Sequence, residues 1–268
     1  MASDSRQLSY GRSAFGEDPQ RYASARPAYP PVLYEWLAEI CGITGKRMFE
    51  VGPGTGIATA RLLEMGPAAL TAIEPDARLA DHLARALGDH PQLAVVVSTF
   101  EDAALEPAAF DVGVAAMSFH WLDQEPALAK VFEALRPGGW WAMWWNVYGD
   151  PEEQDAFAEA ARAFFRSLPT MRSWDMERGG AFTVDAPARL ADLARAGFVD
   201  TGARVARWPC TMDADQIVAL ASTWSVAAVM GAEERTALLD GLRDLVDRAF
   251  GGSVERTFLT PLYVGRKA

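Results

Sequence analysis

The chain has 268 residues; half of them are hydrophobic and 23% are charged, with a formal net charge of −11 and an isoelectric point of about 4.8. This composition is typical of a globular protein with its own core and excludes disordered, collagen-like and coiled-coil chains. The acidic balance, without a concentrated basic patch, argues against nucleic acid and anionic membranes as partners.

The sequence also carries no signal for membrane insertion or secretion. No apolar run approaches the ~20 residues that span a bilayer, and the polar segment 1–10 lacks the apolar core of a signal peptide. The two cysteines, Cys41 and Cys210, lie far apart in sequence and indicate neither a disulfide framework nor a metal cluster. We therefore expect a cytoplasmic protein with reduced thiols and no metal.

The first half of the chain shows alternating strand and helix patterns. Residues 1–30 are polar, contain several prolines, and predict an extended arm or short helices before a helix over 32–40. From 46 to 146 the pattern alternates, and this alternation predicts a doubly wound, mostly parallel sheet whose ligands bind beyond the carboxyl ends of the strands. The expected strands are 47–51, 69–73, 93–97, 110–116 and 140–145, with helices over 57–63, 77–87 and 126–135.

The second half is less regular and predicts two more strands with helices inserted between them. Asp213 and Gln216 form a capping box that opens a helix through residue 220. We expect a Rossmann-like α/β fold with a seven-stranded sheet and helical cap insertions, in a single domain of an arm and helix (1–45), a core (46–146), and cap helices with the last two strands (147–268). The further elements expected are helices over 152–168, 187–196 and 233–250 and strands over 198–208 and 256–264.

The most specific motif is the run Glu50-Val51-Gly52-Pro53-Gly54-Thr55-Gly56, where a strand enters a glycine turn and then a helix. Glycines let a backbone approach a ligand closely, and the first N–H groups of the helix point at that ligand. The Gly-x-Gly-x-Gly spacing is one residue short of the dinucleotide fingerprint. Glu74, at the end of the next expected strand, is placed to accept hydrogen bonds from ribose hydroxyls.

These residues, together with Phe110-Asp111 and the turn 135–139, resemble the class I S-adenosylmethionine-dependent methyltransferases over about residues 46–146. Tyr22-x-x-x-Arg26-Pro-x-Tyr-Pro, the pair His120-Trp121 and the last expected strand around Thr260–Tyr263 resemble a small-molecule branch of that family. The resemblance implies that S-adenosylmethionine is the cofactor and S-adenosylhomocysteine its product.

The resemblance also implies roles for individual residues. The glycine loop would lie against the methionine part of the cofactor and the loop 116–118 beneath the sulfonium, while Glu74 would hold the ribose and residues 99–101 the adenine. Arg26 with Tyr22 would pair with the cofactor carboxylate. The complete implied cofactor-binding set is Arg26, Glu50, Gly52, Pro53, Gly54, Thr55, Gly56, Glu74, Pro75, Thr99, Phe100, Glu101, Ala116, Met117, Ser118 and Trp121.

Methyl transfer is an in-line displacement that needs placement and exclusion of water more than an elaborate set of catalytic groups. His120 is our candidate general base because its unperturbed pKa of about 6.5 suits the task; the alternative is a structural histidine. Trp121, Trp144 and Trp145 are expected to form an aromatic wall that stacks on a flat acceptor or faces the sulfonium. The alternative for Trp144 and Trp145, as for Trp140 and Trp141, is packing of helices onto the sheet. Asn146 is placed to contact the acceptor. Cap residues expected to line an apolar acceptor pocket or to form core are Met171, Trp174, Met176, Trp224 and Met230.

The function hypothesis is methyl transfer to a small, aromatic or hydrophobic acceptor by a monomer or homodimer. One alternative is a cofactor-binding protein without enzymatic activity. Another is a nicotinamide-dependent oxidoreductase, against which the shortened glycine spacing argues. A protein or nucleic acid acceptor is disfavoured because the expected cap would bury a small molecule and the chain is acidic.

Overall fold

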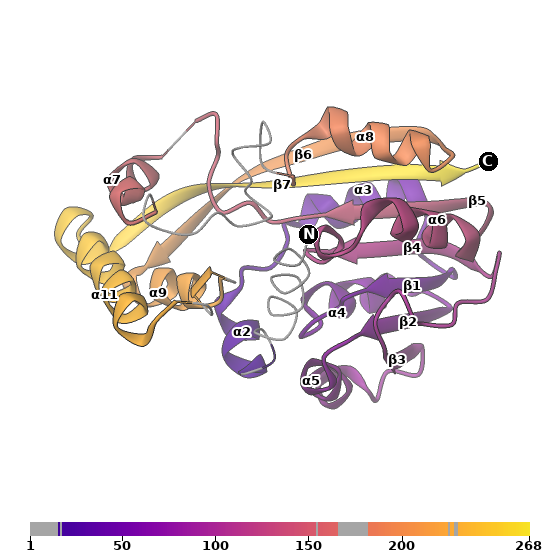
Figure 1. Ribbon diagram of the computed structural model, residues 1–268, viewed down its shortest axis with the longest axis horizontal. Helices are drawn as coiled ribbons and strands as arrows, with labels where there is room; N and C mark the ends of the chain where they lie inside the picture. The colour runs from indigo at the N-terminus through magenta and orange to yellow at the C-terminus, as the bar shows by residue number, and fades with distance from the viewer. Residues whose placement is uncertain (1–15, 17, 154, 166–181, 225, 228–229) are drawn as a thin grey trace.

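The computed structural model describes residues 16, 18–153, 155–165, 182–224, 226–227 and 230–268. Its centre is one seven-stranded sheet in the order β3-β2-β1-β4-β5-β7-β6 (Figure 1). The first five strands are parallel, and β7 runs antiparallel to both of its neighbours. The strands are β1 (Arg47–Val51), β2 (Ala69–Glu74), β3 (Leu93–Val97), β4 (Phe110–Ala116), β5 (Leu135–Trp144), β6 (Phe198–Asp213) and β7 (Ser253–Lys267).

The strand order determines where the ligand crevice of such a sheet lies. The chain builds β1, β2 and β3 toward one edge and then returns to add β4 and β5 on the other side of β1. Helices that follow strands on opposite sides of β1 diverge, and this leaves a crevice beyond the carboxyl ends of β1 and β4. The predicted Rossmann-like α/β fold with seven strands is confirmed.

Helices cover both faces of the sheet because the strands alternate their side chains between two apolar clusters. Trp141 and Trp145 of the β5 region point into one cluster and Trp144 into the other, which is the period of two expected for a strand buried on both faces. On one face pack α3 (Pro31–Cys41) and α4 (Ile57–Glu64), on the other α6 (Gln124–Ala134) and α8 (Ala186–Arg195), while α5 (Ala77–Leu87) lies against β2 and β3.

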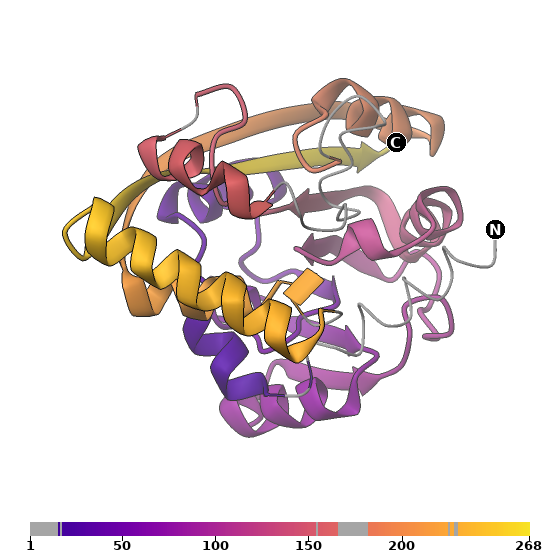
Figure 2. The same ribbon diagram turned by 60° about the vertical axis from the view of Figure 1, so that its left-hand side comes forward.

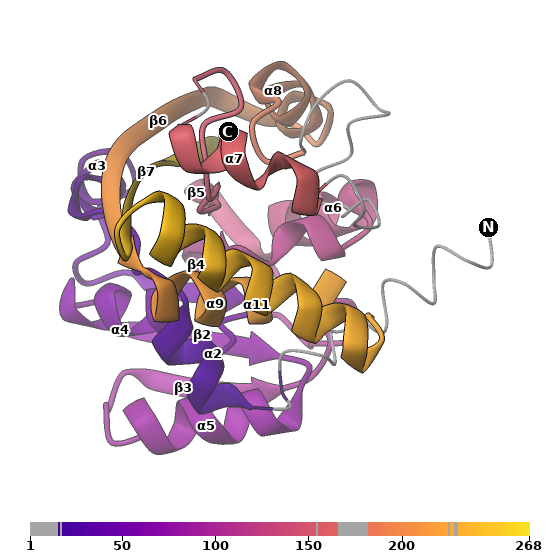
Figure 3. The same ribbon diagram turned by 90° about the vertical axis from the view of Figure 1, so that its left-hand side faces the viewer.

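The cap lies beyond the carboxyl ends of β1 and β4, around a third apolar cluster (Figures 1 and 3). In that cluster Leu220, Leu242 and Phe258 are buried together, so α9 and α11 pack on the far ends of β6 and β7. The turned view in Figure 2 shows α11 running along this end of the molecule. The helices here are α7 (Ala156–Phe165), α9 (Ala214–Ser222), α11 (Ala232–Ala249) and, from the arm, α2 (Pro19–Ala25).

Several element boundaries differ from the predicted ones for local reasons. The helix predicted over 152–168 begins only at Ala156, because Asp150 accepts the N–H groups of Glu152 and Glu153 in a turn and Asp155 accepts the N–H of Ala158. Its predicted end beyond residue 165 lies outside the described residues. The capping box of Asp213 and the helix it opens are confirmed.

The strands of the last pair are longer than their patterns predicted. β6 continues to Asp213 and β7 begins at Ser253, because the two pair along their whole length from Phe198 with Lys267 to Asp213 with Ser253. Their far ends extend past the rest of the sheet and carry the cap. β5 likewise begins at Leu135, so the predicted turn 136–139 is the irregular start of this strand.

We predict that Gly113→Ala lowers the melting temperature. A Cβ at Gly113 would stand 2.3 Å from the ring of Phe49, and that ring is itself held between Phe100 and Trp141. Overpacking of this kind costs about 1–3 kcal/mol of unfolding free energy. The matched control is Gly202→Ala, whose Cβ has Val264 at 3.7 Å. Equal melting temperatures for the two variants would contradict this account of the core.

Candidate functional site

The three glycines of the loop after β1 have left-handed backbone conformations, with φ of +64° at Gly52, +59° at Gly54 and +91° at Gly56. A Cβ at Gly52 would lie 2.6 Å from Ser118, and one at Gly56 would lie 2.5 Å from Leu83, so these positions allow close packing on the β4 loop and on α5. Gly54 has nothing within 4 Å of that position. The backbone at Gly54 is therefore the part of the loop that a ligand can approach.

Glu74 connects the end of β2 to this loop. One carboxylate oxygen accepts the N–H of Gly54 and the other accepts the N–H of Asp76, each at 3.0 Å. Burial raises the pKa of Glu74 to about 6, although both backbone hydrogen bonds favour the ionised form. Each oxygen keeps a lone pair for a further donor, as two neighbouring ribose hydroxyls would provide.

Beneath the loop lies a group of buried polar atoms without partners among the described residues. Glu50 is fully buried; its Oε2 accepts a hydrogen bond from Thr59 at 2.7 Å, while its Oε1 has no partner. The hydroxyls of Tyr34 and Thr55 are also buried and unpartnered. Burial, with a smaller contribution from the charge of Glu74, raises the pKa of Glu50 to about 7. A ligand that supplies a cation and hydrogen-bond donors would satisfy this group.

The cation of the site is Arg26, which lies in the arm directly after α2. Arg26 donates from Nε and Nη2 to the hydroxyl and the carbonyl oxygen of Thr223, both at 2.9 Å, and from Nη1 to the hydroxyl of Tyr148 at 3.0 Å. The rings of Tyr22 and Tyr148 lie 4.9 and 5.4 Å from its guanidinium carbon. No carboxylate of the described chain pairs with Arg26, and its guanidinium carries more N–H donors than these three bonds use.

The loop after β4 lies against the glycine loop, as the resemblance implied for residues 116–118. The Ser118 hydroxyl donates to the carbonyl oxygen of Val51. Met117 has a φ of +57°, a conformation uncommon for a residue with a side chain, and its sulfur accepts the N–H of Asn146 at 3.0 Å. These contacts hold the loop beside Gly52.

The residues predicted to surround the adenine differ from one another in exposure and in their contacts. The end of β3 lies beside β2, since the N–H of Ser98 donates to the carbonyl oxygen of Glu74. Thr99 is half-buried and bonds to Asp102, Glu101 is exposed, and Pro75 is exposed next to Glu74. The ring of Phe100 points instead into the core, where it stacks on Phe49 at 6.3 Å, so Phe100 can reach a ligand only through its backbone.

His120 lies in the short helix η1 (Phe119–Trp121) after β4 and is buried. Its Nδ1 accepts the indole N–H of Trp145 at 3.0 Å. The neutral ring therefore carries its proton on Nε2, and the lone pair that a general base would use is occupied. Nδ1 of His120 thus takes part in a structural hydrogen bond, and the role of His120 as a general base stays a prediction. The ring of Trp121 lies 4.8 Å from that of His120.

The neighbouring residues that we considered for the acceptor are mostly used in packing. Trp144 and Trp145 are fully buried in the core. The expected contact of Asn146 with the acceptor is wrong, because its amide is used within the chain: Oδ1 accepts from Thr260 at 2.7 Å and Nδ2 donates to the carbonyl of Pro27 at 3.1 Å. Trp224 and Met230 pack on the cap cluster; Met171, Trp174 and Met176 lie outside the described residues.

Sequence reasoning missed Tyr148 and Thr223, the partners of Arg26. No motif marks either residue, and each lies more than a hundred positions from Arg26 in sequence. The structure thus adds two polar side chains to the site on the side of the cap.

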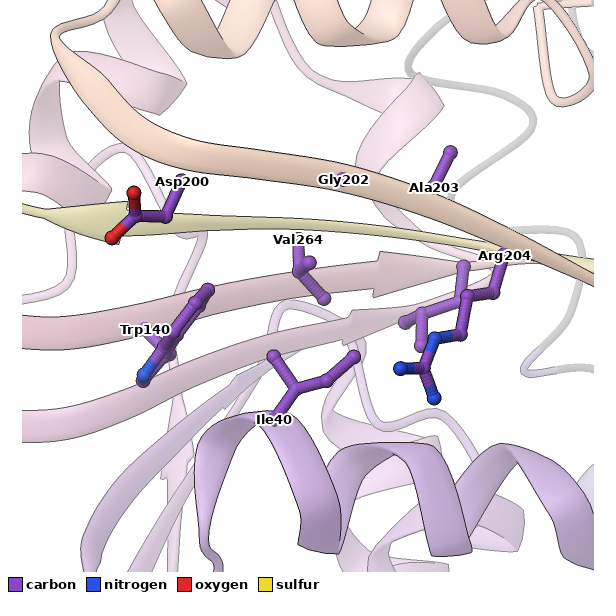
Figure 4. Close-up of a pocket in the computed structure, with 8 residues that line it drawn as sticks. Ile40, Trp140, Asp200, Gly202, Ala203, Arg204 and Val264 are labelled. Carbon is purple, nitrogen blue, oxygen red and sulfur yellow. The ribbon is translucent and has the colours of Figure 1, made fainter.

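Another pocket lies apart from this site, on the sheet face that α3 covers and toward the amino end of β5 (Figure 4). Its charged rim is already paired, Arg204 with Glu39 and Asp200 with Arg266. Within the described ranges, no group of three or more acidic, histidine or cysteine side chains could hold a metal ion. The same part of the chain contains no helix long and apolar enough to cross a membrane.

Comparison with known proteins supports the interpretation of the glycine loop. A family profile described as a methyltransferase domain matches residues 49–143. An uncharacterized methyltransferase from Geobacillus thermodenitrificans is 30% identical over 193 residues, which make up 71% of this chain and 84% of that protein. For other curated methyltransferases, matched at 34% identity, the chain spans about half of their length.

Solved structures agree with the fold. A structure from Anaeromyxobacter dehalogenans assigned to the type II methyltransferases is 25% identical, with a TM-score of 0.63, and the match covers 90% of this chain and 97% of that one. Phosphoethanolamine N-methyltransferase 2 from Haemonchus contortus, solved with S-adenosyl-L-methionine, has a TM-score of 0.55 at 14% identity over 95% of this chain and 56% of that one. With this fold and these relatives, the chain belongs to the family of class I S-adenosylmethionine-dependent methyltransferases.

Proposed function

We propose that this protein transfers a methyl group from S-adenosylmethionine to a small-molecule acceptor. The observation that carries the proposal is the arrangement of charge around the glycine loop. Among the described residues, one buried carboxylate oxygen of Glu50 has no hydrogen-bond partner, and the guanidinium of Arg26 has no carboxylate partner. These are the charges that the ammonium and the carboxylate of the cofactor's methionine part require. The carboxylate of Glu74 would accept hydrogen bonds from the hydroxyls of the ribose.

The chain's own residues would act in these places. Arg26 would bind the cofactor carboxylate with its remaining N–H groups, and Glu50 the ammonium. Backbone groups of the glycine loop would follow the methionine part, and residues 116–118 would pass beneath the sulfonium. Pro75, Thr99, the backbone of Phe100, and Glu101 would surround the adenine. When bound, the cofactor supplies an electrophilic methyl group.

For the acceptor we propose a small, aromatic or hydrophobic molecule. α9, α11 and the arm lie over the carboxyl ends of β1 and β4 (Figure 3), and a site covered in this way favours a small molecule over a polymer. Trp121 would pack beside the sulfonium and the acceptor, and His120, whose ring lies 4.8 Å from that of Trp121, would lie next to the acceptor. In the transfer, a lone pair of the acceptor would form the bond to the methyl carbon, the electrons of the broken carbon–sulfur bond would stay on sulfur, and any proton lost by the acceptor would pass to solvent.

We further propose a cytoplasmic location, in line with the free thiols of Cys41 and Cys210, and a monomer or homodimer in which residues 1–268 act as one domain.

Calorimetric titration tests the cofactor. We expect micromolar binding of S-adenosylhomocysteine and no binding of nicotinamide dinucleotides. Glu74→Ala should weaken binding by about 1–3 kcal/mol, since ribose hydroxyls would lose a buried acceptor. Glu125→Ala, which removes a carboxylate exposed in the first turn of α6, is the control. Binding of a dinucleotide in place of the sulfur compound would overturn the proposal and favour an oxidoreductase.

A second prediction concerns the pH dependence caused by Glu50. Its folded pKa of about 7 lies above the ordinary value of 4.5, so the stability contributed by the neutral form is present below about pH 4.5 and is lost as pH rises through 7. Glu50→Gln keeps the shape without the charge. At pH 8 we expect the variant to melt at a higher temperature than the wild type, with a free energy of unfolding larger by about 1–3 kcal/mol, and we expect this difference to shrink toward pH 5.

The same substitution should weaken S-adenosylhomocysteine binding at pH 8, because the ammonium of the ligand would lose its carboxylate. Wild-type affinity should rise between pH 6 and 8 as Glu50 ionises, and the affinity of the variant should change less. Glu125→Gln serves as control for both measurements. A variant that gains no stability at pH 8, or that binds the ligand as tightly as the wild type, would contradict these assignments.

The tautomer of His120 can be observed directly. The chain has three histidines, so the ring nitrogens of His120 can be assigned in a nitrogen-15 spectrum of the folded protein. We expect the proton on Nε2 while Trp145 donates to Nδ1. Trp145→Phe removes that donor and should shift the tautomer equilibrium toward Nδ1–H, whereas His82 should be unchanged. A proton found on Nδ1 in the wild type would support the base hypothesis.

A further inference from the structure

Arg26 joins three segments that are distant in sequence. It belongs to the arm; one of its partners, Tyr148, follows β5 at a separation of 122 residues, and the other, Thr223, follows α9 at a separation of 197. Figure 3 shows α2 lying between α9 and α5, so the arm is in contact with the cap on one side and with the cofactor half of the sheet on the other. The guanidinium is therefore the polar link between the arm and α9.

The arm itself is held to the sheet independently of Arg26. Asn146 donates to the carbonyl oxygen of Pro27 and accepts from Thr260, which in turn accepts from the indole of Trp208 at 2.9 Å. This chain of hydrogen bonds leads from the arm to β7 and β6. The arm can thus stay in place while the link to α9 changes.

Thr223 is suited to hold the guanidinium in one orientation. Its hydroxyl donates to the carbonyl oxygen of Leu220 at 2.7 Å, so its lone pairs are directed to other donors, and its own carbonyl accepts a second bond from Arg26. Elsewhere in the described chain, Arg204, Arg207 and Arg256 pair with carboxylates. The partners of Arg26 are neutral, so its charge stays available for an anion.

We propose that Thr223 and Tyr148 are positioning residues for methyl transfer, which act through Arg26. They hold its guanidinium where it meets the cofactor carboxylate, so that cofactor binding and the placement of α9 stabilise each other. This inference rests on the proposed function, in which Arg26 binds that carboxylate. Because linkage is reciprocal, a bound cofactor would stabilise the cap side of the acceptor site, and a bound acceptor would stabilise the cofactor site by the same free energy.

Hydrogen exchange of the full chain tests the linkage. The two probes are S-adenosylhomocysteine and 5′-methylthioadenosine, which has the same nucleoside and thioether but no amino acid part. We expect S-adenosylhomocysteine to slow amide exchange in α9 at residues 214–222 several-fold, and 5′-methylthioadenosine, at saturation, to leave these amides unchanged.

The variants Thr223→Val and Tyr148→Phe remove hydroxyls without changing the volume of the side chains much. In the double variant we expect S-adenosylhomocysteine to bind about tenfold more weakly and no longer to protect α9, while the affinity for 5′-methylthioadenosine stays the same. Ser222→Ala is the matched control, because the Ser222 hydroxyl bonds only within α9, to the carbonyl oxygen of Ala219. It should keep the full protection. Circular dichroism melting verifies that each variant is folded.

The outcomes separate the two proposals. Equal protection of α9 by both probes, or full protection in the double variant, overturns the positioning role and leaves the proposed function standing. A wild-type protein that binds neither probe overturns the proposed function, and with it this inference. Weaker binding of both probes in the double variant assigns Thr223 and Tyr148 a structural role only, and also overturns the proposal.

Discussion

The geometry of the site depends on the carboxylate of Glu74. β1 and β2 pair in parallel with Val51 opposite Ile73, so the residue after Ile73 is level with the start of the glycine loop. The side chain of Glu74 then reaches the N–H of Gly54, and its second oxygen holds the backbone at Asp76. A loop whose glycines permit many conformations is thereby held in one, and the lone pairs left on the carboxylate face the same opening as Gly54.

Burying the carboxylate of Glu74 costs folding free energy through desolvation, and a bound ligand would offset this cost. Glu50 and Glu74 are both buried. Desolvation raises the pKa of Glu50, and the charge of Glu74 raises it further. A core selected only for stability would have other residues in place of these two buried carboxylates. In the proposed function, the ammonium near Glu50 and the hydroxyls near Glu74 would make this arrangement a specific and favourable set of contacts, and ligand binding would stabilise the folded protein.

The positively charged side chain of the site, Arg26, belongs to the arm and not to a strand of the sheet. Arg26 lies where the arm, the end of β5 and the end of α9 meet, and its hydrogen-bond partners among the described residues are the neutral groups of Thr223 and Tyr148. The cap cannot take up this position unless β6 and β7 extend past the sheet to carry α9 and α11. The long last strands are thus part of the site, although they contribute no group to the glycine loop.

Local patterns in the sequence were enough to predict the strands of the first half, the glycine loop with Glu74, and the capping box at Asp213, because each depends on residues close to one another in the chain. The partners of side chains were not predictable in this way. Trp145 occupies the lone pair of His120 and Thr260 occupies the amide of Asn146, and both change the chemistry those residues can perform. Contacts between distant segments also determine the lengths of β6 and β7 and the link from Arg26 to Thr223. The periodicity of the sequence does not encode such contacts, and only packing in three dimensions decides them.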